Sequence, residues 1–557
     1  MNSSLPAPKT QTRLAVIDND GTVLRDLFEF FSAEGYAVST FRTAGRQMFS
    51  TIVKQVSDFR PHLVILDLRL SSQADEDDLT GLLLLRDLLS ARCILYSSFI
   101  TAEVLDEAEK VLAVPTDSEC YSAQRRVFRH RKTRSPANLI EEAKQLAETM
   151  SSAMRPELLI RHPRTWNLAT LVKTLGEDGP PLPDETIADV LVQLYPASSR
   201  FVLEAMDGAI MDIHSASSGR SVVLKLYRDS YAAVALKITH TQDGLNECEN
   251  YTKYVKGRLN GGFHTTLEKF VIFWDVAAST YKFIGSTQNS VITFSQFYQS
   301  ESDPQTILTP LEHLFKTVWM RLYNAGRAAV DYEAERKANT LFDLYEEDLK
   351  LRRRFDRLEP EQKEISNELV EHKILNPVWW LLQWGEDSVI LPTTYLAVTH
   401  GDLHGDNIYV EREFSWVIDF ERTGWGHILR DFTELEIDIV TRLVAKAVDS
   451  STFVYLLRAL VAPHHPSQKV RCPDLVERNP EAYKAFRVIF GLREIAQSVT
   501  GYQDQREYLW GLLFDATFIG TRRRIEPHLK ERAILFASII ATRLDAWGKP
   551  WSIIGST

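Results

Sequence analysis

The residues whose types and spacing point most directly to a reaction lie between positions 400 and 421. They read His400-Gly401-Asp402-Leu403-His404-Gly405-Asp406-Asn407, followed by Trp416-Val417-Ile418-Asp419-Phe420-Glu421. Transfer of a phosphoryl group to a hydroxyl needs a carboxylate that orients or deprotonates the hydroxyl, and oxygen ligands that hold Mg²⁺ against nucleotide phosphates. Asp402 fits the first role, and Asn407 and Asp419 fit the metal-ligand role. The spacing therefore predicts an ATP- and Mg²⁺-dependent phosphoryl-transfer centre.

Three other interpretations of the same residues remain open. They could be ordinary polar loop residues at strand ends, or an intact motif in a pseudokinase that binds nucleotide without turnover. The paired His and Asp residues could also belong to a metallohydrolase, although no HExxH or comparable zinc spacing occurs. A P-loop ATPase is disfavoured because the chain lacks GxxxxGK[ST].

The stretch resembles the catalytic loop of the aminoglycoside phosphotransferase and choline-kinase-like superfamily, H-G-D-x-H-x-x-N followed by a strand that ends in Ile-Asp. The resemblance implies a bilobal kinase-like fold, ATP and Mg²⁺ as cofactors, and a hydroxyl group as acceptor. It places His400, Asp402, Asn407 and Asp419 in the catalytic centre. It also implies that Asp431 braces the catalytic loop, whereas a helix N-cap is the plainer alternative for that aspartate. Within the superfamily, the small lobe resembles the ternary-complex-associated phosphotransferase group.

A lysine is expected to contact the ATP phosphates from the third strand of the small lobe. Lys237 lies in the apolar run Ala232–Ile238 and needs a partner there, because an unpaired buried ammonium is costly. Glu247 on the following helix is the preferred partner, and Glu249 is the alternate. Lys225 competes with Lys237 for this role.

The loop over the phosphates is expected to lack the usual glycine-rich sequence. Its candidates are Ser217-Ser218-Gly219, with Ser218 and Gly219 as the cofactor-binding residues, or Asp207-Gly208.

The first 150 residues alternate short apolar runs with helical patterns, which is typical of a parallel sheet covered on both faces. Expected strands are Leu14–Ile17, Leu63–Leu66 and Cys93–Tyr96, and expected helices are Thr22–Glu34, Gly81–Leu89, Thr101–Leu112 and Pro136–Met150. Ligands of such sheets bind at the carboxyl ends of the strands. Asp18, Asp67 and Ser97 fall there.

This pattern resembles the receiver domain of response regulators, which implies a flavodoxin-like fold with Asp67 as phosphoacceptor and Asp18 in the acidic pair. Lys132 is a candidate for the lysine that ends the fifth strand. Asn19 stands where a second acid is usual, and the loop after Asp67 is long. Two alternatives remain, a phosphorylated receiver and a phosphate-independent receiver-like module. The basic run Arg125–Lys132 is interpreted as a solvated face or a partner-binding patch.

The predicted order is a receiver-like domain (10–150), a helical connector (151–195), a kinase-like small lobe (196–300) and a helical large lobe (301–557). The small lobe should contain one helix and six strands, listed in chain order: Phe201–Met206, Ala209–His214, Val222–Tyr227, Ala232–Ile238, helix Asp243–Arg258, Phe270–Trp274 and Val291–Phe294. A β-like insert, Ile408–Phe420, should interrupt the large lobe.

Composition narrows the environment and the partners. Hydrophobic residues make up 44% and charged residues 25%, and the net charge of −11 makes nucleic acid or an anionic membrane an unlikely partner. The four cysteines form no CxxC pair, and no secretory leader or membrane span is recognised. We therefore expect a cytoplasmic phosphotransferase, and the order of a receiver-like domain before a catalytic one resembles bacterial architectures, which implies a bacterial origin. Its acceptor, a small molecule or a protein, is unknown, and its receiver-like module regulates or docks a signalling partner. The alternative is an inactive receiver–pseudokinase scaffold.

Overall fold

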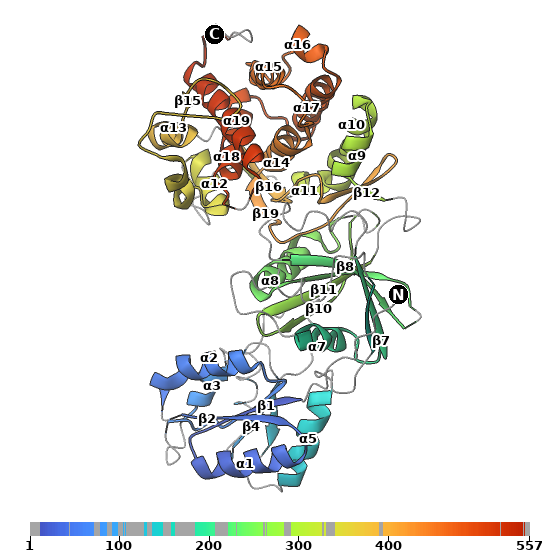
Figure 1. Ribbon diagram of the computed structural model, residues 1–557, viewed down its shortest axis with the longest axis vertical. Helices are drawn as coiled ribbons and strands as arrows, with labels where there is room; N and C mark the ends of the chain where they lie inside the picture. The colour runs from blue at the N-terminus through green and yellow to red at the C-terminus, as the bar shows by residue number, and fades with distance from the viewer. Residues whose placement is uncertain are drawn as a thin grey trace. The chain divides into compact units, whose positions relative to one another are not determined.

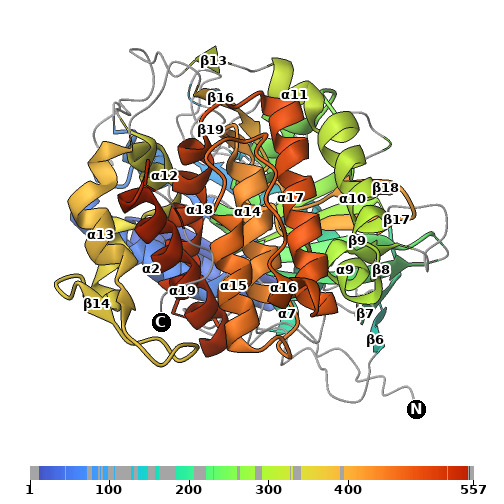
Figure 2. The same cartoon turned by 90° about the horizontal axis from the view of Figure 1, so that it is seen from above.

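The computed structural model describes residues 12–43, 45–71, 78–85, 88, 92–97, 104, 106, 127–130, 136–148, 157–161, 184–205, 221–229, 231–259, 262, 264–282, 291–325, 328–329, 340–388, 394–523, 525–549 and 551. The chain forms two compact units (Figures 1 and 2). We call them the sheet unit, Met1–Thr252 with Leu267–Phe283, and the helical unit, Lys253–Thr266 with Ile284–Thr557.

The sheet unit begins with a five-stranded parallel sheet in the order β2-β1-β3-β4-β5. The strands are β1 (Arg13–Asp18), β2 (Ala37–Arg42), β3 (Leu63–Leu66), β4 (Arg92–Tyr96) and β5 (Val127–His130). The helices are α1 (Gly21–Ala33), α2 (Phe49–Phe59), α3 (Thr80–Leu85) and α5 (Pro136–Glu148). α1 and α5 cover one face, α2 and α3 the other (Figure 1). The predicted receiver-like fold is confirmed.

Two strands of this sheet were not predicted. β2 is a half-exposed edge strand without a clean apolar alternation. β5 lies inside the basic run that was interpreted as a solvated or partner-binding face. In β5, Val127 and His130 are buried and Arg129 is exposed. Residues 127–130 of the basic run therefore form a strand of the sheet. Most of the predicted helix Thr101–Leu112, and Lys132, lie outside the described residues.

The second sheet of this unit has six strands in the order β10-β11-β9-β8-β7-β6. They are β6 (Glu157–Arg161), β7 (Arg200–Ala205), β8 (Ser221–Arg228), β9 (Val234–His240), β10 (Leu267–Phe273) and β11 (Val276–Lys282). The helices are α7 (Asp184–Leu194) and α8 (Thr241–Asn250), and α8 continues as a π-helix over Tyr251–Val255. The predicted strand Ala209–His214 lies outside the described residues.

The structure differs from the prediction of a helical connector over residues 151–195. Residues 157–161 form β6 and pair in parallel with β7, and only residues 184–194 of the described connector are helical. An apolar run as short as this one cannot be assigned to strand or helix by periodicity. β11 was also missed. The predicted strand at Val291–Phe294 shrinks to β12 (Ile292–Thr293), because α9 begins at Phe294.

The helical unit is mainly α-helical, with a β-like insert as predicted. Its helices are α9 (Phe294–Ser300), α10 (Pro304–His313), a π-helix (Leu314–Val318), α11 (Met320–Ala325), α12 (Leu341–Leu349), the 3₁₀-helices η6 (Arg352–Leu358) and η7 (Gly385–Asp387), α13 (Pro377–Trp384), α14 (Arg430–Asp438) with a π-helix (Ile439–Leu443), α15 (Ser450–Leu460), α16 (Asp474–Glu477), α17 (Pro480–Thr500), α18 (Gln505–Gly520) and α19 (Pro527–Asp545). Its strands besides β12 are β13 (Ala328–Ala329), β14 (Glu364–Ile365), β15 (Ile374–Leu375), β16 (Tyr395–Thr399), β17 (Ile408–Glu411), β18 (Phe414–Val417) and β19 (Gly424–His427). α14 packs against α17 and α18 (Figure 2). None of the helices in the described ranges is both long and apolar enough to cross a membrane.

The two sheets of the sheet unit share a core. Ile17 and Val64 of the receiver-like sheet belong to the same cluster of buried side chains as Leu191, Leu224 and Leu236. A cluster that spans both sheets means that the receiver-like fold is a built-in part of this unit, because separating the sheets would expose the shared apolar surface to water.

A buried charged triad, Arg13, His62 and Asp189, lies where the two sheets meet. Asp189 Oδ2 accepts from His62 Nε2 at 2.8 Å and from the Arg13 guanidinium at 3.1 Å. His62 and Asp189 are fully buried. His62 Nδ1 accepts the Arg13 backbone N–H at 2.9 Å, so the ring donates to Asp189 through Nε2.

Two residues with left-handed backbones meet at the same junction. Arg60 (φ 49°) ends α2, and Trp274 (φ 57°) turns the β10–β11 hairpin. Arg60 pairs with Asp275 at 2.7 Å, and Trp274 Nε1 donates to Pro61 O at 3.0 Å. Non-glycine residues adopt this backbone region only where surrounding contacts hold them there. The junction thus fixes the α2–β3 loop to the hairpin.

Replacing Asp189 by alanine should strongly destabilise the sheet unit. The change leaves Arg13 and His62 buried without their carboxylate, which typically costs about 3 kcal/mol or more. Chemical denaturation of the full chain, followed by far-ultraviolet circular dichroism, measures the effect.

Asp26→Ala is the matched control for this measurement. Asp26 pairs with Arg25 at an exposed position, with both side chains more than half exposed, so its loss should change stability by less than about 1 kcal/mol. Equal effects of the two substitutions would contradict the role given to the buried triad.

Candidate active site

The candidate catalytic loop, residues 400–407, connects β16 to the β17–β18 hairpin. β16 pairs antiparallel with β19, and Ile408 pairs with Val417 at the open end of the hairpin. The Ile418 N–H donates to Asn407 O at 3.1 Å. Asn407 and Asp419 are therefore brought to the base of one hairpin, as their spacing predicted.

Both predicted metal ligands have suitable chemistry. Asn407 Nδ2 donates to Asp402 O at 2.8 Å, which leaves Asn407 Oδ1 as the atom that can accept a cation. Asp419 has φ 66°, in the left-handed region, and is only partly buried. Amide and carboxylate oxygens are the ligands that Mg²⁺ prefers, so these residues fit that ion. Among the described residues, no cluster of three or more His, Cys, Asp or Glu side chains is arranged to hold a metal by itself.

Gly401 is required by the path of the loop. Its φ is +78°, and a Cβ on it would lie 2.4 Å from Arg422 O. A larger residue would suffer both backbone strain and a clash with main chain that cannot rotate away. The glycine before Asp402 therefore lets the loop pass close to the segment that follows Asp419.

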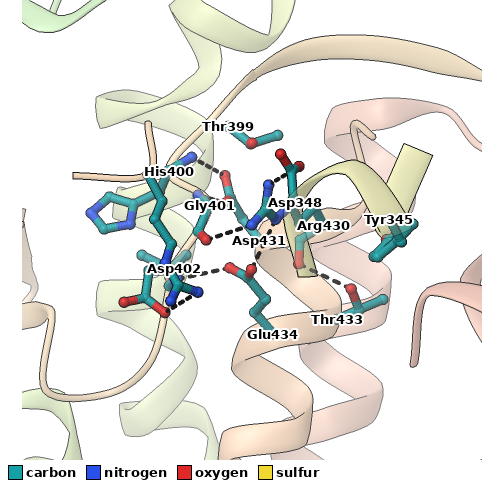
Figure 3. A network of polar contacts seen from close by, with 12 residues as sticks. Tyr345, Asp348, Thr399, His400, Gly401, Asp402, Arg430, Asp431, Thr433 and Glu434 are labelled. Atoms are coloured by element: carbon teal, nitrogen blue, oxygen red, sulfur yellow. Dashed lines mark hydrogen bonds and ion pairs between the residues drawn. The ribbon is translucent and has the colours of Figure 1, made fainter. Parts of the chain in front are cut away.

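Three carboxylates of α14 hold the backbone of the loop, and Figure 3 shows two of them, Asp431 and Glu434. Asp431 Oδ2 and Oδ1 accept the N–H groups of His400 and Gly401, each at 3.0 Å. Glu434 accepts the Leu403 N–H at 2.9 Å, and Asp438 accepts the Gly405 N–H at 2.8 Å. We call Asp431, Glu434 and Asp438 the acidic ladder.

The spacing of the acidic ladder matches the loop. Its members are three and four residues apart, or about 4.5 and 6 Å along the helix, and they accept from the N–H groups of loop residues that are two positions apart, Gly401, Leu403 and Gly405. The loop alternates accordingly, with buried residues at 401, 403, 405 and 407 and partly exposed ones at 402, 404 and 406. The ladder holds the buried backbone positions, and the side chain of Asp402 is left accessible.

The predicted bracing role of Asp431 agrees with this geometry, and the N-cap alternative does not. The N-cap of α14 is Leu429, and Asp431 lies in the first turn, fully buried. Tyr323 Oη donates a third hydrogen bond to Asp431, at 2.6 Å.

An ion pair, Arg430–Glu434, holds the peptide groups on both sides of Asp402. Arg430 donates to Gly401 O at 2.8 Å and to Glu434 Oε1 at 2.9 Å, while Glu434 Oε2 accepts from Leu403 N–H. Arg430 also pairs with Asp348. A second arginine, Arg442 in the π-helix that continues α14, joins Asp438, at 2.7 Å, to the side chain of Asp406, at 2.8 Å. Sequence reasoning missed these residues. The signal for them was the spacing of acids in residues 430–438, directly after the motif.

His400 is buried, and its ring forms a hydrogen bond with the backbone. Its Nε2 donates to Ile418 O at 2.8 Å, so it holds the residue before Asp419, and its ring packs against Trp319 and Phe420. Burial lowers the pKa of His400 below its ordinary value, although Asp431 and other nearby carboxylates oppose this. The ring is therefore neutral at pH 7.

Asp402 is the accessible carboxylate of the loop. Its side chain is 28% exposed, and its Oδ1 lies 3.6 Å from the Arg422 guanidinium. Burial raises the pKa of Asp402, but nearby positive charges, that of Arg422 first, outweigh this effect and lower the pKa to about 2. Asp402 is thus ionised at neutral pH.

In the sheet unit, the predicted Lys237–Glu247 ion pair is present. Lys237 Nζ lies 2.9 Å from Glu247 Oε2, both side chains are buried, and Tyr281 Oη donates to Glu247 Oε1 at 2.5 Å. Lys225 lies on the neighbouring strand, opposite Ala235, and is only partly buried. The contact favours Lys237 and Glu247 over Lys225 and Glu249. The phosphate-loop candidates Ser217-Ser218-Gly219 and Asp207-Gly208 lie outside the described residues.

In the receiver-like sheet, the predicted residues gather at the carboxyl ends of β1, β3 and β4. Asp18, Asp67 and Ser97 are buried there. Asp18 Oδ1 accepts the Asp20 N–H at 2.9 Å, and Asp20 caps α1 through Thr22 N–H. Asn19 donates to Arg69 O at 2.8 Å. Asn19 and Asp20 therefore organise the backbone beside Asp18 and Asp67, and phosphorylation of Asp67 stays a prediction.

Residues 345–517 match the family model of Ternary complex associated domain 9, which agrees with the predicted group, although the match lies in the large lobe and not in the small lobe that suggested it. No curated protein matched the chain in a sequence search. Among solved structures, a BeF₃-activated receiver domain of RstA from Klebsiella pneumoniae is 17% identical, with a TM-score of 0.19 over 24% of this chain and 97% of that one. A glucosamine kinase with glucosamine, ADP and inorganic phosphate is 11% identical, with a TM-score of 0.33 over 65% and 84%. A thermostable aminoglycoside phosphotransferase APH(4)-Ia is 12% identical, with a TM-score of 0.30 over 59% and 96%.

The acidic ladder should make stability depend on pH through Glu434. Burial, opposed by Arg430 but aided by Asp431 and Asp402, raises the pKa of Glu434 to about 7 from 4.5. A raised pKa contributes stability that is fully present below pH 4.5 and is lost as pH rises through 7, by up to about 3 kcal/mol. Thermal unfolding at pH 5 and pH 8 should therefore show a smaller loss of stability in Glu434→Gln than in the wild-type protein.

Glu361→Gln, at an exposed position, should keep the wild-type dependence on pH. If Glu434→Gln and the wild type lost stability equally between pH 5 and pH 8, Glu434 would not be the titrating member of the ladder.

Proposed function

We propose that the chain is an ATP- and Mg²⁺-dependent phosphotransferase that acts on a hydroxyl group. The observation that carries the proposal is the joint placement of Asp402, Asn407 and Asp419 on one loop and the base of one hairpin. The backbone N–H groups of His400, Gly401, Leu403 and Gly405 in that loop are held by carboxylates of α14. Phosphoryl transfer depends mainly on positioning and electrostatics, which is what such a held loop provides.

Asp402 would orient the acceptor. A carboxylate with a pKa of about 2 is a weak base, so its first role is to accept a hydrogen bond from the acceptor hydroxyl. It can take the proton as the new phosphorus–oxygen bond forms and the hydroxyl becomes strongly acidic. His400 does not reach outward, since its ring is buried against Trp319 and Phe420. We therefore give it a positioning role on the backbone before Asp419.

Asn407 and Asp419 would hold Mg²⁺, which neutralises charge on the nucleotide phosphates when bound. In the sheet unit, Lys237 would contact phosphate oxygens, with Glu247 orienting it. The left-handed backbone of Asp419 supports this assignment, because strain of this kind is commonly held at functional sites.

We further propose that the receiver-like fold serves as a regulatory or docking module for a signalling partner. This proposal is supported by the shared core and the buried Arg13–His62–Asp189 triad. Both connect the receiver-like fold to the sheet that bears Lys237. The cytoplasm, where ATP is abundant, is the proposed location.

Two variants should distinguish the proposed role of Asp402 as a base from the proposed role of Asp419 as a metal ligand: Asp402→Asn and Asp419→Ala. Asp402→Asn keeps shape and should retain Mg²⁺-dependent ATP binding while lowering turnover by about 10²-fold or more. Asp419→Ala should lose both Mg²⁺-dependent binding and turnover, because it removes a ligand of the ion. Calorimetry with Mg·ATP and an assay of ADP release measure the two quantities.

Asp474→Asn, in an exposed pair with Arg471, is the control and should behave as wild type. Wild-type turnover in Asp419→Ala would remove the phosphotransferase assignment. Tight Mg·ATP binding with no turnover by the wild-type protein, whatever the acceptor, would indicate a nucleotide-binding scaffold instead.

Lys237→Met should reduce ATP use at least about tenfold more than Lys225→Met, because only the phosphate-contacting lysine stabilises the transferred charge. The measurement is kcat/KM for ATP in the two variants. The reverse order would assign the phosphate contact to Lys225 and leave the Lys237–Glu247 pair a structural role.

A further inference from the structure

Two arginine-rich segments far apart in sequence meet near Asp402. One is η6, with Arg354 and Arg357, and the other follows α18, with Arg522. The guanidinium groups of Arg354 and Arg522 lie over the Phe518 ring, 4.7 and 5.8 Å from its centroid. Arg357 donates to Thr521 O at 2.8 Å, which fixes the two segments to each other.

Arg422 connects this pair of segments to the candidate base. Its guanidinium lies 3.6 Å from Asp402 Oδ1, on the strand connection that follows Asp419. We call Arg354, Arg357, Arg422 and Arg522 the arginine cluster.

The cluster carries an excess of positive charge. Partial burial, and then the charges of Arg357, Arg522 and Arg422, lower the pKa of Arg354. Partial burial also lowers the pKa of Arg522, with Asp402 opposing and Arg422 adding to the effect. Arg422 and Arg522 are close enough to Asp402 to lower its pKa, and Arg354 and Arg357 lie beside the segment that bears Arg522, in a protein whose overall net charge is −11. Like charges gathered in this way are unfavourable unless an anion joins them.

The cluster is accessible to a ligand. The Arg422 side chain is 38% exposed, Arg357 is exposed, and Arg354 and Arg522 are half-buried. The planar fork of arginine donates paired hydrogen bonds that match a phosphate group, and phosphate contacts of this kind are among the stronger polar interactions in proteins.

We propose that the acceptor is an anionic small molecule, a hydroxyl compound that carries a phosphate group, and that the arginine cluster binds this phosphate. The inference rests on the proposed function, because it identifies the substrate class of the same site. The bound phosphate places a neighbouring hydroxyl beside Asp402. The hydroxyl oxygen forms a bond to the γ-phosphorus of ATP, the bond from that phosphorus to the β–γ bridging oxygen breaks, ADP leaves, and the hydroxyl proton passes to Asp402.

The test compares two double variants of the full chain with the same change in charge. Arg354→Gln/Arg522→Gln removes two members of the cluster, and Arg353→Gln/Arg523→Gln removes their exposed sequence neighbours. Inorganic phosphate is the calorimetric probe. Its Kd should rise at least about tenfold in the first variant and stay within about twofold of wild type in the second, while the Kd of Mg·ATP is unchanged in both. Arg354→Lys, which keeps the charge but loses the planar fork, should weaken phosphate binding by less and checks that the loss does not come from misfolding.

Matched acceptors give the second readout. Ribose 5-phosphate and glycerol 3-phosphate should stimulate ADP release more than ribose and glycerol. Equal phosphate binding by the two double variants, no saturable phosphate binding by the wild type, or preference for the neutral acceptors would overturn the inference. Failure of the proposed function would look different, since Mg·ATP turnover would be absent while phosphate binding still distinguished the two double variants.

Discussion

The candidate active site depends on the hydrogen bonds between the acidic ladder of α14 and the backbone of the catalytic loop. The loop from His400 to Asn407 makes no regular secondary structure, so its buried N–H groups need acceptors from elsewhere. Asp431, Glu434 and Asp438 supply them from one helix face at 2.8–3.0 Å. Hydrogen bonds with a charged acceptor are stronger than neutral ones, which suits a loop that must present Asp402 in one orientation.

Three acids on one helix face repel one another, and the structure offsets this with arginines. Arg430 lies within the ladder and donates to both Glu434 and the carbonyl of Gly401, and Arg442 bonds Asp438 and Asp406. The same arrangement explains why burial and the neighbouring acids raise the pKa of Glu434 while Asp402, facing Arg422 at the outer side of the loop, stays ionised. The loop therefore has opposite charge environments on its two sides, an acidic one from α14 and a positive one from Arg422.

The sequence predicted the candidate site residues that the structure brings together better than it predicted the residues that support them. Asp402, Asn407, Asp419 and the Lys237–Glu247 pair could be found because each belongs to a motif, or to a buried position that demands a partner. The supporting residues could not be found in this way: Glu434, Asp438, Arg430 and Arg442. Charged residues on a helix are normally interpreted as a solvent-exposed face unless the loop that covers them is known. Strands such as β6 and β11 were missed because pairing with a distant strand, and not local propensity, decides whether a short run becomes a strand. The arginine cluster depends on two segments separated by more than 150 residues, and no local pattern links them.

Hydrogen exchange of the catalytic loop tests most directly whether α14 holds it. The exposed turn at Arg412–Glu413 in the same hairpin is an internal reference, and the peptide of α14 is another. If the ladder holds the loop, peptides covering residues 401–405 should exchange nearly as slowly as α14 in the wild-type protein, because their N–H groups are released only when the loop leaves the helix. Exchange of these peptides as fast as that of the turn at Arg412–Glu413 would contradict the account.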